Sequence, residues 1–218
     1  MKLLDSSFSR TLLAIAGLTL GGLEFSGAAI LASYNFNGAT TSGDGDANST
    51  ATNFTSNYGS NSGLSGAGNY FVRVQVTPAV ATTTYYFSFT VTAASGFTLN
   101  LTDLTLEAAL VDSSGPSGTT FVRSSVDGYA ADLGSYTQTG TSGSTFTDRS
   151  IDLSGAAYQN LSTITFRIYH YDTTDSADTT GLVHRIDDVI LNGNAIPEPA
   201  SFALLGLGGL SLLARRRR

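Results

Sequence analysis

The stretch Tyr85–Thr92 reads YYFSFTVT, and its side chains alternate between apolar and polar with a period of two. One face takes Tyr85, Phe87, Phe89 and Val91. Successive side chains of a β-strand point to opposite sides of the sheet, whereas a helix repeats every 3.6 residues. This stretch therefore predicts a β-strand with one buried face.

The same signature, with β-branched and aromatic residues, recurs on both sides of it. Because Leu104 and Leu106 have the opposite parity to Phe97–Leu101, we expect a turn or bulge at Thr102-Asp103. The predicted strands are Ile30–Phe36, Tyr70–Val76, Tyr85–Thr92, Phe97–Leu101, Thr105–Val111, Thr119–Val126, Ser144–Leu153, Leu161–Tyr171 and Leu182–Asn192. The polar, glycine-rich stretch Thr40–Asn69 is expected to be a long loop or an irregular strand pair.

Short strands joined by turn residues such as Asp127-Gly128 and Asn192-Gly193 favour a particular architecture. We expect an all-β domain, a two-sheet β-sandwich with the jelly roll as the favoured arrangement. An N-terminal signal helix and a C-terminal apolar helix are expected to flank it. The predicted organisation is residues 1–28 as signal peptide, 29–194 as sandwich and 195–218 as a C-terminal segment.

The charges lie unevenly along the chain. The whole chain has a net charge of -6, but Ala29–Ile196 holds five Arg against thirteen Asp and one Glu, a net charge of −9. A lysine-free acidic domain lacks the basic surface that nucleic acid requires, so we exclude nucleic acid as a partner. The chain has no cysteine, which excludes disulfides, thiolate metal sites and cysteine nucleophiles.

The first residues have the layout of a secretory signal. Lys2 and Arg10 supply positive charge, Thr11–Gly22 is apolar, and Ser26-Gly27-Ala28 is a small-x-small cleavage site. Cleavage after Ala29 and an amphipathic first helix of the domain are the alternatives. The pattern predicts export.

The last residues combine an uncharged stretch with a basic end. Ala200–Ala214 would span roughly 22 Å as a helix, at about 1.5 Å per residue, which is short of the roughly 30 Å hydrocarbon core. By the positive-inside rule Arg215, Arg216, Arg217 and Arg218 would stay in the cytoplasm and leave the domain outside. A simple membrane anchor with a proline-rich hinge is one interpretation.

Pro197-Glu198-Pro199, followed by that apolar stretch and the arginines, resembles the PEP-CTERM sorting signal. The resemblance covers about the last 23 residues and implies recognition by exosortase, a membrane transpeptidase of Gram-negative bacteria that make exopolysaccharide. It implies transient membrane anchoring, tail removal and a cell-surface or extracellular destination. It implies nothing about the preceding domain.

The sandwich itself offers little for catalysis. His170 and His184 lie in separate predicted strands without zinc-site spacing, and Gly63–Ala67 lacks the last glycine of a nucleophile elbow. Glu107 is the only glutamate of the interior, so no opposed carboxylate pair is evident. We expect no catalytic residues and no enzyme.

One loop has oxygen ligands at alternate positions. Asp44, Asp46 and Asn48 would suit a hard cation such as calcium, with Asp187 and Asp188 as ligands from the last strand if the chain ends meet. The closing glutamate of an EF-hand is absent, and such strings are also ordinary turns. Calcium is the only cofactor that the sequence suggests.

A second candidate site lies on the strand near residue 170. Alternation places Arg167, Tyr169 and Tyr171, beside Asp172, on the face opposite Ile168. Aromatic rings next to charged groups can stack on sugars and bind hydroxyls, although cross-strand pairing selects the same residues. Arg185–Gly193 also resembles the last strand of carbohydrate-binding jelly rolls.

These features predict an exported, non-catalytic β-sandwich of the cell surface or extracellular matrix. Its expected partners are exosortase and the export machinery, the membrane through the tail, and extracellular polysaccharide. A secreted polysaccharide hydrolase or lyase is the alternative.

Overall fold

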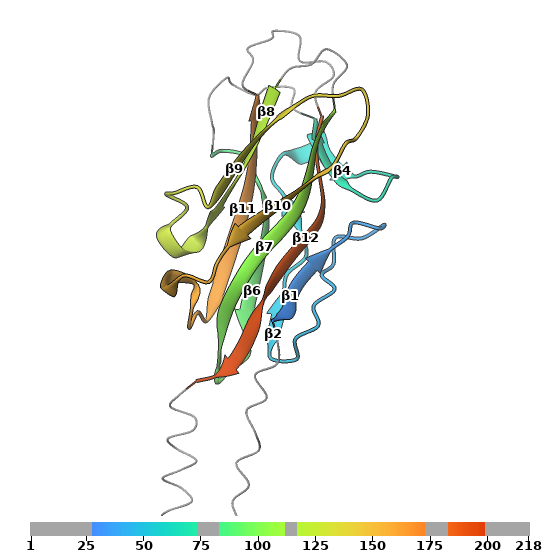
Figure 1. Cartoon of the computed structure of the whole chain (residues 1–218). Helices are drawn as coiled ribbons and strands as arrows, with labels where there is room; N and C mark the ends of the chain where they lie inside the picture. The colour runs from blue at the N-terminus through green and yellow to red at the C-terminus, as the bar shows by residue number, and fades with distance from the viewer. Residues whose placement is uncertain (1–27, 74–82, 112–116, 173–182, 199–218) are drawn as a thin grey trace, which may run out of the picture.

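The computed structural model describes residues 28–73, 83–111, 117–172 and 183–198 (Figure 1). They form two packed antiparallel sheets, as the sequence predicted. The predicted signal helix and apolar C-terminal helix lie outside the described residues. Within these residues, no helix is long and apolar enough to cross a membrane.

Within the described ranges each sheet has six strands. Sheet A consists of β10 (Thr147–Asp152), β7 (Phe97–Val111), β12 (Val183–Pro197), β5 (Tyr70–Arg73), β4 (Ser62–Leu64) and β1 (Ala29–Tyr34). Sheet B consists of β2 (Ser49–Ala51), β3 (Thr55–Ser56), β6 (Phe87–Ala93), β11 (Thr163–Asp172), β8 (Ser117–Ser124) and β9 (Gly134–Thr139). Three 3₁₀ turns, η1 (Gly59–Asn61), η2 (Ser125–Asp127) and η3 (Ala156–Tyr158), lie in the connections.

Strands β5 to β12 form a jelly roll. The chain pairs with itself like a long hairpin, because β8 pairs with β9, β7 with β10, β6 with β11 and β5 with β12. Rolling that hairpin produces the order β10-β7-β12-β5 in one sheet and β6-β11-β8-β9 in the other. The favoured arrangement is therefore confirmed.

The core lies between the inward faces of the two sheets. Phe87, Phe89 and Val91 of β6 are buried, as alternation predicted, but Tyr85 precedes the strand and is 46% exposed. Phe54 belongs to the stretch Thr40–Asn69, which was expected to be a long loop or an irregular strand pair and contains the short strands β2, β3 and β4. Its side chain is only 2% exposed and its ring lies 5.3 Å from that of Tyr34. Phe54 thus anchors this polar segment to the core.

The expected irregularity near Thr102 is a bulge within one long strand. Asn192 of β12 pairs with Asp103 and Gly193 with Leu101, so Thr102 is an extra residue on β7. The bulge keeps Leu101 and Leu104 both buried despite their opposite parity. The predicted strands Phe97–Leu101 and Thr105–Val111 are therefore one continuous strand, β7.

The described ends of the chain lie at the same end of the sandwich (Figure 1). Ala29 of β1 pairs with Gly193 of β12, and Pro197 pairs with Phe97 at the start of β7. One residue further, the Glu198 N–H donates to the Gly96 carbonyl over 2.8 Å. The first two residues of the Pro-Glu-Pro motif therefore continue the sheet without a linker.

Candidate functional site

Strand β11 presents Arg167, Tyr169 and Tyr171 on the outward face of sheet B, as alternation predicted. Register places Tyr169 opposite Phe121 of β8, and Arg167 opposite Arg123. Two like charges directly opposite each other destabilise a sheet unless other groups compensate them. The contacts of the two arginines show that each is compensated in a different way.

Arg167 is held between two tyrosine rings. Its guanidinium carbon lies 4.1 Å from the ring centroid of Tyr86, which precedes β6, and 3.8 Å from that of Tyr129, in the β8–β9 connection. Both distances are well within the roughly 6 Å range of cation–π attraction. Among the described residues the Arg167 side chain has no ion-pair partner.

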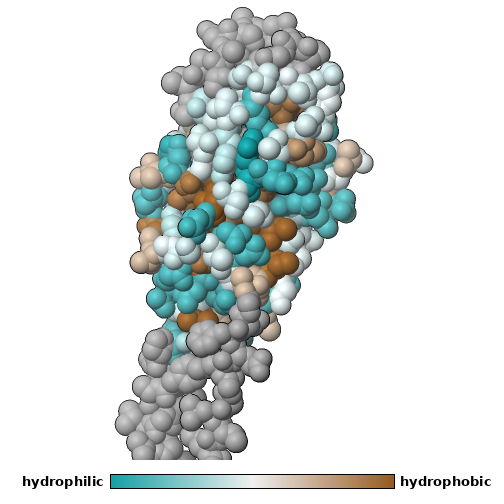
Figure 2. Space-filling model, viewed as in Figure 1, coloured by the Kyte–Doolittle hydropathy of each residue, from teal (hydrophilic) through white to brown (hydrophobic). Residues whose placement is uncertain are grey.

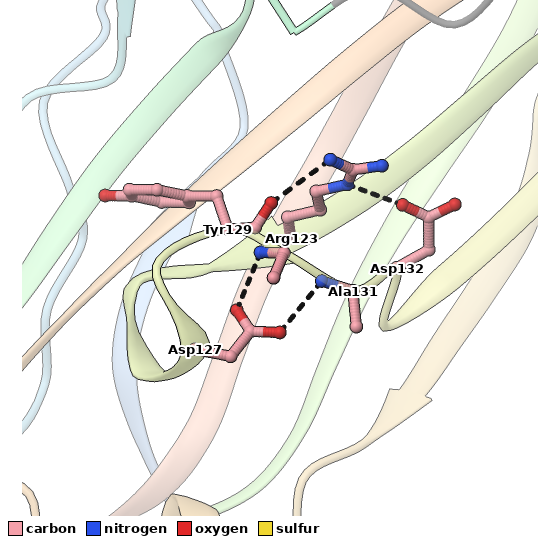
Figure 3. Close-up of polar contacts among 6 residues, drawn as sticks. Arg123, Asp127, Tyr129, Ala131 and Asp132 are labelled. Carbon is pink, nitrogen blue, oxygen red and sulfur yellow. Dashed lines mark hydrogen bonds and ion pairs between the residues drawn. The ribbon is translucent and has the colours of Figure 1, made fainter.

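Arg123 has an acidic partner instead. Its Nε lies 2.6 Å from Asp132 Oδ1, and its Nη1 donates to the Tyr129 carbonyl over 3.1 Å (Figure 3). Its guanidinium carbon also lies 5.1 Å from the centroid of Phe121. The Arg123 charge is thus neutralised within the fold, and its donors hold the β8–β9 connection.

That connection is built to place Tyr129. Gly128 and Tyr129 have φ angles of 71° and 66°, so two consecutive left-handed residues turn the chain back over sheet B. The Asp127 carboxylate accepts the Ala130 and Ala131 N–H groups over 3.1 and 2.8 Å (Figure 3). These hydrogen bonds, that of Ala131 most of all, hold the pKa of Asp127 below its usual range.

The Tyr169 ring is buried, so a sugar ring cannot stack on it. Its ring stacks on that of Phe121, with centroids 4.8 Å apart and planes at 10°, and its side chain is fully buried. Burial raises the pKa of its hydroxyl, while the charges of Arg167 and Arg123 act in the opposite direction. Tyr169 is therefore the packed base of the site, and the half-buried Tyr86, Tyr129 and Tyr171 form its accessible part.

Threonine hydroxyls continue the same face toward the other end of the strands. Thr165 lies 2.7 Å from Thr90 and Thr163 lies 3.0 Å from Thr92, hydroxyl to hydroxyl, across β11 and β6. We call the region of Tyr86, Phe121, Arg123, Tyr129, Arg167, Tyr169 and Tyr171 the arginine–tyrosine face. It combines one unpaired cation, partly exposed rings and a neighbouring row of hydroxyls.

The residues proposed for calcium in the loop and in the last strand are not brought together. Asp44 Oδ1 and Asp46 Oδ1 accept backbone N–H groups within their own loop, and Asp46 Oδ2 lies 3.5 Å from the Ala195 nitrogen. Asp188 precedes Ala195 by seven residues, or about 23 Å of strand at about 3.3 Å per residue. No three His, Asp or Glu side chains of the described ranges are grouped to hold a metal ion.

The other predicted residues are only partly described. Ala28 of the cleavage site is exposed at the first described position, whereas Ser26 lies outside the described residues. The same holds for Pro199 and Arg215–Arg218, while Pro197 and Glu198 are half-buried. Asp172 ends β11, and its side chain is also outside what the structure describes.

The outward face of sheet A, seen in Figure 2, is mostly hydrophilic with small separate apolar patches. A shallow hollow of about 280 Å³ on it is lined by Leu64, Ser65, Gly66, Phe71, Val183 and Arg185. None of these described lining residues is an acid or a histidine.

Comparison with known proteins identifies the C-terminal segment. Residues 195–218 match the family model described as the PEP-CTERM protein-sorting motif. The protein is thus a β-sandwich with a C-terminal sorting motif. More particularly, it carries a PEP-CTERM motif and is an exported protein of the cell surface or extracellular space. No curated protein matches the sequence.

Solved structures with a similar arrangement are remote in sequence. A cleaved adhesin domain of Lys-gingipain from Porphyromonas gingivalis is 17% identical, covering 74% of this chain and 97% of its own, with a TM-score of 0.42. The xylan-binding domain CBM22-1 from Paenibacillus barcinonensis is 14% identical, covering 77% and 96%, with a TM-score of 0.40. The N-terminal cellulose-binding domain of a Cellulomonas fimi β-1,4-glucanase is 15% identical, covering 75% and 88%, with a TM-score of 0.36. At such values the likeness does not extend to a ligand.

Proposed function

We propose that this protein is a non-catalytic β-sandwich of the cell surface or extracellular matrix that binds glycans through the arginine–tyrosine face. The observation that carries the proposal is Arg167, held between Tyr86 and Tyr129 at 4.1 and 3.8 Å. A guanidinium fixed in this way has already lost its rotamer freedom, so little ordering free energy is spent when a ligand binds.

The rest of the face supports the same ligand class. Sugar rings present apolar C–H surfaces and hydroxyls, which suit partly exposed tyrosine rings and a polar sheet surface. Thr90 and Thr165 provide hydroxyls on the same side of sheet B. The base of the face is rigid because Phe121 and Tyr169 are packed and buried.

The carboxylates nearest the face support a binding role over a catalytic one. A glycosidase of the usual kind requires two carboxyl groups free to act as acid and base or nucleophile. Asp127 accepts two backbone N–H groups and Asp132 is paired with Arg123. Neither of these two described carboxylates is free to act in the hydrolase or lyase alternative.

The sorting motif supports processing by exosortase during export. In this proposal the tail holds the precursor at the membrane until the Pro197-Glu198-Pro199 region is cleaved. Mass spectrometry of the exported protein tests this step. A C-terminus near Pro199 is the expected result, and a released protein that still ends in Arg218 would contradict it.

Glycan binding is tested with the exported protein on a polysaccharide panel that includes the producing cell's own exopolysaccharide. We expect at least one ligand, weakened when Tyr129→Ala removes the outer ring. Thr137→Ala, on edge strand β9 of the same sheet, is the matched control. Failure to bind any polysaccharide would reject glycan binding, and release of new reducing ends would reject the non-catalytic assignment.

A further inference from the structure

The two arginines of the face differ in what their charges meet. The N–H donors of Arg123 are directed at Asp132 and at the Tyr129 carbonyl. Arg167 lies against the ring faces of Tyr86 and Tyr129, and no carboxylate of the described ranges lies within ion-pair distance of it. Among the described residues Arg149 and Arg185 have no ion-pair partner either, but Arg167 alone lies between two partly exposed tyrosine rings on the outward face of sheet B.

We propose that Arg167 is an anion-recognition group and that the glycan bound by this face is acidic, carrying carboxylate or sulfate groups. This inference rests on the glycan-binding function proposed above and names the ligand class. The ligand anion pairs with Arg167 in the way that Asp132 pairs with Arg123.

The ring sandwich keeps the recognition group available. Cation–π contacts hold the guanidinium by its two faces, so its in-plane N–H donors, apart from the one directed at the Tyr169 hydroxyl, are left for a ligand. Arg167 Nε is buried without a hydrogen-bond partner among the described residues, so the terminal nitrogens are the contacting groups. Arginine forms two parallel hydrogen bonds with a planar carboxylate, a geometry that a neutral hydroxyl does not match.

The acids near the two arginines determine how the face would select an anionic ligand. Asp127 and Asp132 offset the two arginines, so the face has no large positive field. Both acids are already engaged, by backbone N–H groups and by Arg123 respectively. Recognition therefore depends on a directed contact from Arg167, and we expect only moderate sensitivity to salt.

The test compares polysaccharides that differ in charge and share a backbone. The exported protein is titrated with polygalacturonate and its fully methyl-esterified form, and with dextran sulfate and dextran. We expect an anionic member to bind about tenfold tighter than its neutral partner, the scale of a charge-assisted hydrogen bond. If both polygalacturonate and dextran sulfate bind, Arg167 recognises either kind of anion. If polygalacturonate alone binds, the recognised group is a carboxylate.

Variants assign the preference to Arg167. Arg167→Gln should abolish it, and Arg167→Lys, which keeps the charge but loses the planar fork, should lose most of it. Arg149→Gln is the control, because Arg149 also lies over a tyrosine, Tyr136, at 5.0 Å but belongs to β10 of sheet A. If Arg167→Gln unfolds the protein, Arg167→Lys decides, with the melting temperature measured for each variant.

The outcomes separate the two proposals. Equal binding of charged and neutral partners, with binding still lost in Tyr129→Ala, would overturn the acidic-ligand inference and leave glycan binding intact. A preference unchanged in both Arg167 variants would also overturn it. Absence of binding to every polysaccharide, including the cell's own, would reject glycan binding itself.

Discussion

His170 of β11 and His184 of β12 lie against each other between the two sheets, with ring centroids 4.6 Å apart and planes at 34°. Each side chain is only 1% exposed. The Nδ1 of His170 shares a 2.9 Å hydrogen bond with the Thr120 hydroxyl. Thr120 thus satisfies one ring nitrogen of His170, whereas its Nε2 has no hydrogen-bond partner among the described residues.

This pair predicts that acid destabilises the domain. Burial, and then the charge of His184, lowers the pKa of His170 well below its usual range. The folded state therefore keeps His170 neutral while the unfolded state takes up a proton below pH about 6.5, so stability is lost as pH falls, by up to about 1.4 kcal/mol per pH unit. Urea denaturation at pH 7.5, 6.5 and 5.5 measures the loss.

His170→Asn is the matched variant, because its amide can still reach Thr120 but does not titrate. We expect it to be less stable than the natural protein at pH 7.5 and to lose less stability on acidification. Equal losses in the two proteins would contradict the assignment to His170.

Gly193 is predicted to tolerate no side chain. A Cβ at this bulge would lie 2.5 Å from the Asn100 carbonyl oxygen and 2.8 Å from Leu31 Cδ1. Overpacking of this kind costs roughly 1 to 3 kcal/mol, so Gly193→Ala should lower the free energy of unfolding by that amount. Gly143→Ala, where a Cβ meets nothing within 4 Å, should stay within about 0.5 kcal/mol of the natural protein.

Removing one charge from sheet A should stabilise the fold. Glu107 of β7 pairs with Asp148 of β10 and Asp187 of β12, which aligns three acids across neighbouring strands. Burial, followed by Asp188, Asp148 and Asp187, raises the pKa of Glu107. The repulsion is present at neutral pH and fades as pH falls through that raised pKa.

Glu107→Gln should therefore gain about 0.5 kcal/mol at pH 7, the scale of a cross-strand pair. Calorimetric melting measures the gain. In 1 M NaCl, where the Debye length is about 3 Å, the gain should largely disappear. If the stability gain persists in 1 M NaCl, its cause is not the removal of charge repulsion.

The Asp127 carboxylate is predicted to control the order of the Tyr129 loop. Asp127→Ala removes the acceptor of two N–H groups, so hydrogen exchange at Ala130 and Ala131 should accelerate and glycan binding should weaken. Asp152→Ala is the control, since Asp152 accepts the Ser154 N–H in a turn after β10. Equal binding by both variants would show that the loop needs no such support.

Exosortase processing, if it occurs as proposed, should be slowed by the sheet. Pro197 is paired with Phe97, so a protease that takes its substrate as a free strand must first open the end of β12. A Gly-Ser-Gly-Ser insertion between Ala195 and Ile196 should accelerate conversion up to about tenfold, as each hydrogen bond contributes about 1 kcal/mol. The same insertion after Gly143 should have no effect in a pulse-chase experiment, and equal rates would reject the coupling.

Much of the fold was predictable because alternation reports directly on burial. It identified the inward face of β6 and the parity change that the bulge at Thr102 accommodates. It missed β9, whose sequence GSYTQT lacks an apolar face because it is an edge strand. The short strands β2 to β4 lie in the stretch expected to be a long loop or an irregular strand pair, and their bounds could not be predicted because they too lack an apolar face.

The site was only half predictable. Alternation grouped Arg167, Tyr169 and Tyr171, but it cannot tell an outward ring that is covered from one that is free. Phe121 and Arg123 belong to the site because β8 pairs with β11. The sequence pattern does not reveal which strands are neighbours, so these two residues could not be predicted. Asp127-Gly128 is recognisable as a turn, but Tyr129 reaches the site because it is itself left-handed after Gly128, and a tyrosine does not predict that conformation.

The position of β12 has a mechanical consequence. This 15-residue strand is flanked by β7 on one side and by β5 and β1 on the other, and the chain leaves it at Glu198. A pull on that end while sheet B is held by a ligand acts along the strand axis. Such a force loads the hydrogen bonds of both flanks together, in shear, and does not peel them apart one at a time. We expect force spectroscopy through the C-terminal end to record a higher rupture force than pulling on edge strand β10, so that the strand bearing the sorting motif is also the one best able to resist tension.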